Sequence, residues 1–161
     1  PFAVDPVTAE PIRLLNGSKP ALFESAGGGL FSTAADYLRF ARMLLGGGSL
    51  AGKRLLAPKT VALMTSDHLG AELIRASQVA GANNGYLPGP GYGFGLGFAV
   101  RVAAGEAGVP GSVGDYHWSG VAGSFFWIDP AEDLIAIWMM QAPERRQQYW
   151  ALYKNLVYAA L

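Results

Sequence analysis

The sequence predicts an α+β fold in which helices come first, antiparallel strands follow and a final helix closes the chain. Apolar residues recur at helical spacing in residues 33–65 and again in residues 143–161. Residues 91–141 instead contain short apolar stretches bounded by Gly, Pro and Asp, which is typical of strands. Because helices and strands do not alternate as in βαβ units, a parallel, doubly wound sheet is not expected.

The composition is that of a folded domain without a strongly charged partner. The 161 residues suit one domain or part of a larger one, and 51% of them are hydrophobic against 15% charged. The 12 basic residues balance 12 acidic ones, so the charge favours neither nucleic acid nor an anionic membrane. The chain has no cysteine, and its apolar stretch at residues 134–140 is too short to span a membrane.

Residues 1–31 are expected to form an irregular, extended lead-in, because prolines and the run Gly27–Gly29 interrupt any regular pattern. The first residues have no starting methionine and lack the basic and apolar regions of a signal peptide. We therefore expect the chain to begin in mid-protein or after processing.

Two helices are expected in the first half of the chain. Thr33 followed by Asp36 is a capping-box pattern, and apolar residues then recur at helical spacing until a run of glycines. This pattern predicts a helix at residues 33–45. Pro58 suits the first position of a second, short helix at residues 58–65.

A long loop is expected at residues 66–90, which have no sustained period and contain an Asn-Asn-Gly sequence and two prolines. Long loops of this kind often border a functional site, but an ordinary surface loop without a function explains the pattern equally well.

The strands begin where glycine alternates strictly with larger residues, in residues 91–101. A period of two predicts one strand at residues 92–101, with a bare glycine face that another backbone can approach closely. Further strands are expected at residues 115–119, 123–129 and 134–141. The link Gly120–Ala122 predicts an antiparallel hairpin between the first two of these. The nearly continuous apolar run of the last one predicts burial on both faces.

A final helix is expected at residues 144–160, opened by Pro143. Its apolar face is predicted to consist of Tyr149, Trp150, Tyr153, Leu156, Val157 and Ala160. This helix completes the predicted α+β order.

Several kinds of site are not expected. Asp115, His117 and Ser119 share one face of a strand, but alternate residues of a strand stand about 6.6 Å apart. A catalytic triad needs hydrogen bonds of about 2.6–3.2 Å, so we interpret these residues as a polar strand face. The two histidines, His68 and His117, have no metal ligand close by in the sequence, and no G-x-G-x-x-G motif occurs. We therefore expect no metal and no cofactor.

Four segments occur in a recognisable order. They are Ser25–Phe40 with G-G-G-L-F-S-T, Leu55–Met64, Gly91–Phe98 with G-Y-G-F-G-L-G-F, and His117–Pro130 with H-W-S-G-V-A-G-S. Together they resemble the β-lactamase-like serine hydrolases, the family of class C β-lactamases and penicillin-binding esterases. The resemblance implies that residues 1–161 are the C-terminal portion of one such domain. They would supply the late antiparallel strands and C-terminal helix of a β-lactamase-like (penicillin-binding-protein-like) fold, incomplete without its N-terminal segment.

The resemblance also implies acyl-transfer chemistry, with a serine in S-x-x-K as nucleophile and a tyrosine in Y-x-N or Y-x-S assisting proton transfer. No lysine of this chain has a serine three residues before it, so S-x-x-K is absent. The single Y-x-N match, Tyr153–Asn155, follows the third motif instead of preceding it, and we interpret it as a chance match. We therefore predict that this chain alone is inactive and that its partners are the missing N-terminal segment and a small ester or amide substrate.

The family's third motif, K-T-G, aligns with Trp118, Ser119 and Gly120, which are therefore the expected substrate-binding residues. Tryptophan in place of the lysine resembles the esterase-like members and favours an ester substrate. In the family the backbone N–H just after this glycine forms half of the oxyanion hole, and here that residue is Val121.

Three hypotheses remain open on the sequence. The first is an esterase-like serine hydrolase, with penicillin-binding or β-lactamase activity of the intact parent as a variant of it. The second is a non-catalytic binding or sensing module that uses the same pocket wall. The third is a structural or interaction subunit without a small-molecule site. An upstream polypeptide with S-x-x-K, found with the purified chain, would favour the first.

Overall fold

A computed structural model describes residues 30–70, 72–73 and 89–161 of the chain. It also describes a few single positions nearer the N-terminus: Val4, Ala9, Pro11, Phe23, Ser25, Gly27 and Gly28. The predicted lead-in at residues 1–31 and the predicted loop at residues 66–90 therefore lie largely outside the described residues.

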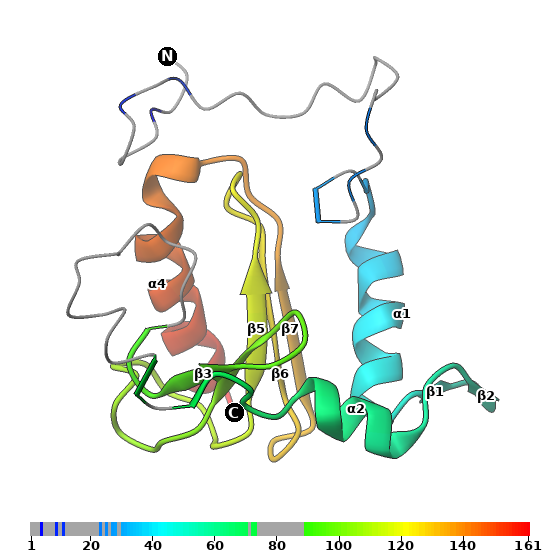
Figure 1. The fold of residues 1–161 in the computed structure, drawn as a ribbon. Helices are drawn as coiled ribbons and strands as arrows, with labels where there is room; N and C mark the ends of the chain where they lie inside the picture. The colour runs from blue at the N-terminus through cyan, green and yellow to red at the C-terminus, as the bar shows by residue number, and fades with distance from the viewer. Residues whose placement is uncertain are drawn as a thin grey trace.

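The described part has three layers, with one helix on each face of a central sheet (Figure 1). The helices are α1 (Ala34–Leu45), α2 (Pro58–Met64), the 3-10 turn η1 (Pro143–Arg145) and α4 (Arg146–Tyr158). The strands are β1 (Ser49–Leu50), β2 (Lys53–Arg54), β3 (Tyr92–Phe94), β4 (Ala99–Arg101), β5 (Tyr116–Ser119), β6 (Phe125–Asp129) and β7 (Leu134–Trp138). Helix α1 covers one face of the sheet and α4 covers the other.

The main sheet is a five-stranded meander in the order β3-β4-β5-β6-β7, and every neighbouring pair is antiparallel. Strands β1 and β2 form a separate small hairpin beside α1. The predicted α+β class with an antiparallel sheet is therefore confirmed, as is the hairpin between the strands expected at residues 115–119 and 123–129.

Helix α1 begins and ends close to the predicted residues 33–45. The Thr33 hydroxyl accepts a hydrogen bond from the Asp36 backbone N–H at 3.1 Å, which satisfies one of the free donors of the first turn. The Asp36 carboxylate accepts from the Thr33 hydroxyl instead of its backbone N–H, so half of the capping box forms. At the other end, Gly48 has a φ of +93°, and a Cβ there would overlap the Leu56 backbone.

The prediction of one strand at residues 92–101 is wrong. The segment folds back on itself as the hairpin β3–β4, and Gly95 N–H donates to the Phe98 carbonyl at 2.7 Å across the turn. Gly97 in this turn has a φ of +95°, which glycine adopts without strain. The expected close backbone approach does occur, because a Cβ at Gly95 would overlap the carbonyl of Met64.

Each face of the sheet buries its own apolar cluster, and the alternation of side chains along the strands separates the two. On the α1 face the buried residues are Ala41, Met43, Leu44, Phe98, Val100, Tyr116, Phe126 and Ile128. On the α4 face Phe125, Trp127 and Ala136 are buried under Trp150, Tyr153, Val157 and Tyr158. Strand β6 contributes side chains to both clusters, so it is packed between α1 and α4.

Two finer expectations were only partly correct. Strand β7 ends at Trp138 and, apart from Ala136, its residues are half-buried, because β7 is an edge strand in the described part of the sheet. The last helix packs Trp150, Tyr153 and Val157 on the sheet as expected, whereas Leu156 is 60% exposed. No helix in the described ranges is long and apolar enough to cross a bilayer.

Candidate functional site

The three residues aligned with the family's third motif meet at one cavity. Trp118 and Ser119 end strand β5, and Gly120 follows them. The cavity has a volume of about 470 Å³ and opens on the α1 side of the sheet. Its other lining residues are Gly27, Leu30, Phe31, Ser32, Tyr37, Ser124, Phe125, Phe126, Ile137, Met139 and Gln141. Predicted substrate-binding residues thus line a common concave surface.

Strand β5 has an unpaired edge beside this cavity. Strand β4 pairs with Tyr116 and His117 of β5, and no strand of the described residues continues that pairing to Trp118 and Ser119. On the other side, β5 stays paired with β6 as far as Ser119. Because backbone groups alternate in direction along an antiparallel strand, the N–H and C=O of Ser119 point to the unpaired edge. An extended substrate could add to the strand there.

Val121 lies in the tight connection between β5 and β6. Gly120 N–H donates to the Ser124 carbonyl at 2.8 Å, and Gly123 N–H donates to the Gly120 carbonyl at 3.0 Å. Within the described residues the Val121 N–H has no acceptor, although its carbonyl accepts from Arg146 at 3.3 Å. Many turns leave such a backbone N–H without an acceptor. An oxyanion hole also requires an N–H donor of this kind, so the Val121 N–H is compatible with both roles.

Aromatic contacts fix the walls of the cavity. Trp118 packs edge-on against Phe94 of β3, with ring centroids 5.0 Å apart. Tyr37 of α1 packs edge-on against Phe126 of β6 at the same 5.0 Å. Burial raises the pKa of Tyr37 to about 12, so its phenol stays a neutral hydrogen-bond donor. Sequence reasoning missed Tyr37, because the helical pattern of residues 33–45 does not reveal which residue faces a cavity.

Asp115, His117 and Ser119 do not form a triad, as expected. Asp115 binds Arg101 at 2.9 Å and Lys154 at 3.0 Å, and no hydrogen bond joins it to His117. The expected polar strand face is nevertheless wrong for Asp115, which is 0% exposed. A charged carboxylate tolerates such burial only with paired cations, and those cations come from β4 and α4, far away in the sequence.

The Y-x-N match at Tyr153–Asn155 has structural contacts of its own. The Tyr153 hydroxyl donates to the Ile137 carbonyl at 3.3 Å, and the Tyr153 ring packs on Trp127. Lys154 belongs to the buried ion cluster around Asp115. These contacts lie on the α4 face, away from the Trp118 wall. Within the described residues, no group of three or more His, Cys, Asp or Glu could hold a metal ion.

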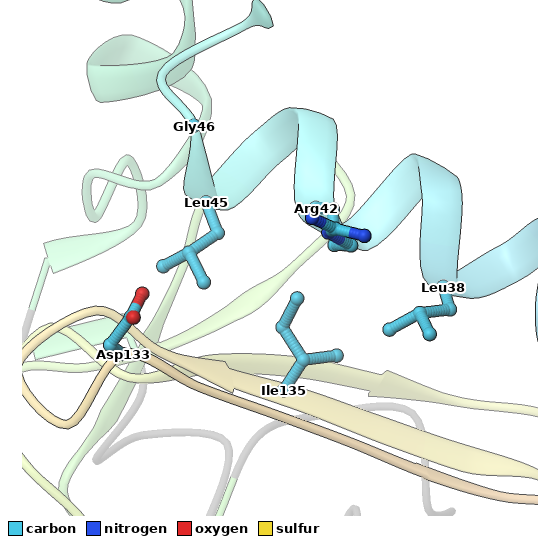
Figure 2. Close-up of a pocket in the computed structure, with 6 residues that line it drawn as sticks. All are labelled: Leu38, Arg42, Leu45, Gly46, Asp133 and Ile135. Atoms are coloured by element: carbon cyan, nitrogen blue, oxygen red, sulfur yellow. The ribbon is translucent and has the colours of Figure 1, made fainter. Parts of the chain in front are cut away.

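A second hollow of about 390 Å³ lies between α1 and the strand β7 (Figure 2). It is lined by Leu38, Arg42, Leu45, Gly46, Asp133 and Ile135. Figure 2 shows Ile135 of β7 below the helix, with Asp133 beneath Leu45. Its lining offers no Ser, His or Tyr that could act as nucleophile or base, so we do not consider it a catalytic site.

Comparison with known proteins shows which family the chain belongs to. The sequence model of the Beta-lactamase family matches residues 2–159. The chain belongs to the β-lactamase family. Two curated relatives, Rv1367c of Mycobacterium tuberculosis strain H37Rv and the uncharacterised MT1414 of strain CDC 1551, are each 41% identical over 128 residues. That match covers 76% of this chain and 30% of each relative.

Solved structures of two other proteins have the same fold as this chain. EstCE1, a hydrolase with promiscuous acyltransferase activity, is 26% identical with a TM-score of 0.71, covering 94% of this chain and 41% of that protein. The simvastatin synthase LovD of Aspergillus terreus is 23% identical with a TM-score of 0.66, covering 83% of this chain and 35% of LovD. The chain therefore spans well under half the length of these relatives, and the predicted β-lactamase-like fold is confirmed for a partial domain.

Proposed function

We propose that this chain forms one wall of the active site of an esterase-like serine hydrolase that acts by acyl transfer. The observation that carries the proposal is the meeting of Trp118, Ser119 and Gly120 at one cavity. Val121, the next residue along the chain, has a backbone N–H without an acceptor in the described part of the chain. The family supports a serine hydrolase in the parent protein, and the acyltransferase activity of EstCE1 favours acyl transfer to or from an ester.

The roles follow from what each group offers. The apolar face of Trp118 and the rings of Tyr37 and Phe126 would hold the acyl chain away from water. The free edge at Ser119 would bind the extended part of the substrate. The Val121 N–H would donate to the carbonyl oxygen as negative charge develops on it. The nucleophilic serine and its lysine would come from the N-terminal segment of the same protein, since S-x-x-K is absent here.

The 161-residue chain by itself should hydrolyse p-nitrophenyl esters no faster than buffer, because it offers no activated serine. Joining it to its upstream segment should restore turnover. The measurement is the release of p-nitrophenol from both proteins, with mass spectrometry for acyl-enzyme. A burst of acylation by the chain alone would contradict the proposal. An intact parent that binds esters but never turns them over would instead indicate a binding module.

Replacing Trp118 with alanine in the intact protein should enlarge the acyl pocket. One methylene that a pocket can or cannot hold changes the ratio of kcat/KM between two substrates by about tenfold or more. The preference for long over short acyl esters should therefore rise by at least about tenfold. The measurement is kcat/KM for p-nitrophenyl acetate, butyrate and octanoate. Trp138→Ala is the matched control, since Trp138 is also a half-buried strand tryptophan but lies on the α4 face. Equal profiles for both variants would show that Trp118 serves only sheet packing.

A further inference from the structure

The tight turn between β5 and β6, residues 120–123, is held by the start of the last helix. Figure 1 shows this turn at the end of the sheet where α4 begins. The Arg146 guanidinium donates to the Val121 carbonyl at 3.3 Å. The Trp150 indole N–H donates to the Gly123 carbonyl at 2.8 Å. Two side chains of α4 therefore fix two peptide units of a turn that lies 25 and 27 residues earlier in the chain.

A third bond to the same turn begins a chain of hydrogen-bonded peptide units. The Ala142 N–H donates to the Ala122 carbonyl at 2.9 Å. The Gly123 N–H belongs to the same peptide unit as that carbonyl, and it donates to the Gly120 carbonyl at 3.0 Å. The Gly120 carbonyl in turn shares a peptide unit with the Val121 N–H. Because C=O and N–H point in opposite directions in a planar trans peptide, the Val121 N–H is the outward-pointing end of this chain.

A chain of this kind both orients and strengthens its last donor. Each hydrogen bond polarises the peptide unit that makes the next one, which strengthens that bond by about 10–30%. The Val121 N–H has no acceptor in the described part of the chain, so its donor capacity is directed away from the turn. A developing oxyanion is stabilised best by donors that are already fixed before the reaction. The turn therefore offers a donor that is both fixed and polarised.

Trp150 is the better placed of the two helix side chains. Its ring stacks on Phe125 with centroids 5.1 Å apart and planes at 21°, so the indole is held in one orientation. Gly123, which receives the indole N–H, has a φ of +111°, which glycine adopts without strain. The bond from Arg146 is longer and exposed to solvent, so it is the weaker of the two.

We propose that Trp150 and Arg146 are positioning residues for acyl transfer, which orient the Val121 N–H toward the carbonyl oxygen of the substrate. They act only through the turn, together with the Ala142 N–H, and need not touch the substrate. The inference rests on the proposed function, because it concerns the oxyanion donor of that same site. It adds α4, which covers the opposite face of the sheet from α1, to the elements that the reaction requires.

Trp150→Phe in the intact protein tests the role of Trp150, because phenylalanine keeps a ring against Phe125 and removes the N–H donor. It should lower kcat for p-nitrophenyl butyrate by about tenfold, less than the loss of about 10²–10³ expected when the oxyanion donor itself is deleted. KM should stay within about twofold, since the contact strengthens only in the transition state. The measurements are kcat, KM and the midpoint of unfolding.

Two controls separate positioning from general damage to the fold. Trp127→Phe makes the same change in the same cluster, but the Trp127 indole N–H has no hydrogen-bond partner in the described residues. It should lower the midpoint of unfolding and keep kcat within about twofold. Arg146→Met should lower kcat by about threefold, whereas Arg145→Met, which removes the same charge one residue earlier, should not.

A double variant tests whether Trp150 acts through Val121. In the Val121→Pro background there is no N–H left to orient, so adding Trp150→Phe should change kcat by less than about twofold. If Trp150 merely supported the fold, the two losses would multiply instead.

The inference is overturned if a folded Trp150→Phe variant keeps kcat, if Trp127→Phe lowers kcat as much, or if the effect of Trp150→Phe is undiminished beside Val121→Pro. Should Trp150→Phe fail to fold, equal kcat for Arg146→Met and Arg145→Met overturns it. A slow Val121→Pro with a fast Trp150→Phe rejects this inference alone. An intact parent without ester turnover rejects the proposed function, and the positioning roles fall with it.

Discussion

Replacing Val121 with proline in the intact enzyme is expected to lower kcat by about 10²–10³, the usual cost of losing one oxyanion-hole donor. Proline removes the backbone N–H of residue 121 but keeps its carbonyl, which accepts from Arg146. Within the described residues that N–H has no internal acceptor, and Val121 is not among those with positive φ. Its side chain is 49% exposed, so little packing is lost. The variant should therefore fold and still be slow.

Val121→Ala is the matched control, because it shortens the side chain but keeps the N–H. It should retain kcat within about twofold, since its donor is unchanged. The measurement is kcat for a p-nitrophenyl ester alongside the midpoint of unfolding for both variants. A folded proline variant with unchanged kcat would remove Val121 from the oxyanion hole. Loss of kcat in step with loss of folding in both variants would show that Val121 acts only as a turn residue.

Replacing Asp115 with asparagine is expected to destabilise the fold by about 3–5 kcal/mol, because it leaves two buried cations without their carboxylate. Asp115 joins four elements of the structure. It binds Arg101 of β4 and Lys154 of α4, and it accepts from the Tyr92 hydroxyl of β3 at 3.4 Å. It also precedes β5, the strand that carries Trp118 and Ser119. The loss should therefore loosen the candidate site as well as the α4 layer.

The measurement is chemical unfolding followed by tryptophan fluorescence. Asp133→Asn is the control, since Asp133 is exposed and its positive φ of 49° suits asparagine equally well. It should change the free energy of unfolding by less than about 0.5 kcal/mol. If Asp115→Asn were as stable as Asp133→Asn, the cluster of Asp115, Arg101 and Lys154 would not hold the layers together.

Local patterns in the sequence determined which segments are helices and which are strands. Thr33 and Pro58 mark helix starts through backbone chemistry that depends on nearby residues alone. The triplet Trp118–Gly120 could be placed at a strand end because the short link Gly120–Ala122 predicts a hairpin there. The family could also be predicted, since the order of four segments is itself a property of the sequence.

Only the tertiary structure decided features that need residues distant in the chain. Alternating glycines in residues 91–98 are compatible with a strand or with a hairpin, and packing against Met64 and Asp67 selected the hairpin. Asp115 was interpreted as part of a polar strand face, and its burial could not be predicted because its partners lie 14 and 39 positions away. The period of a strand predicts which side chains share a face of the sheet. It does not predict which charged side chains from other elements will lie opposite that face, and a buried charge such as Asp115 depends on those partners.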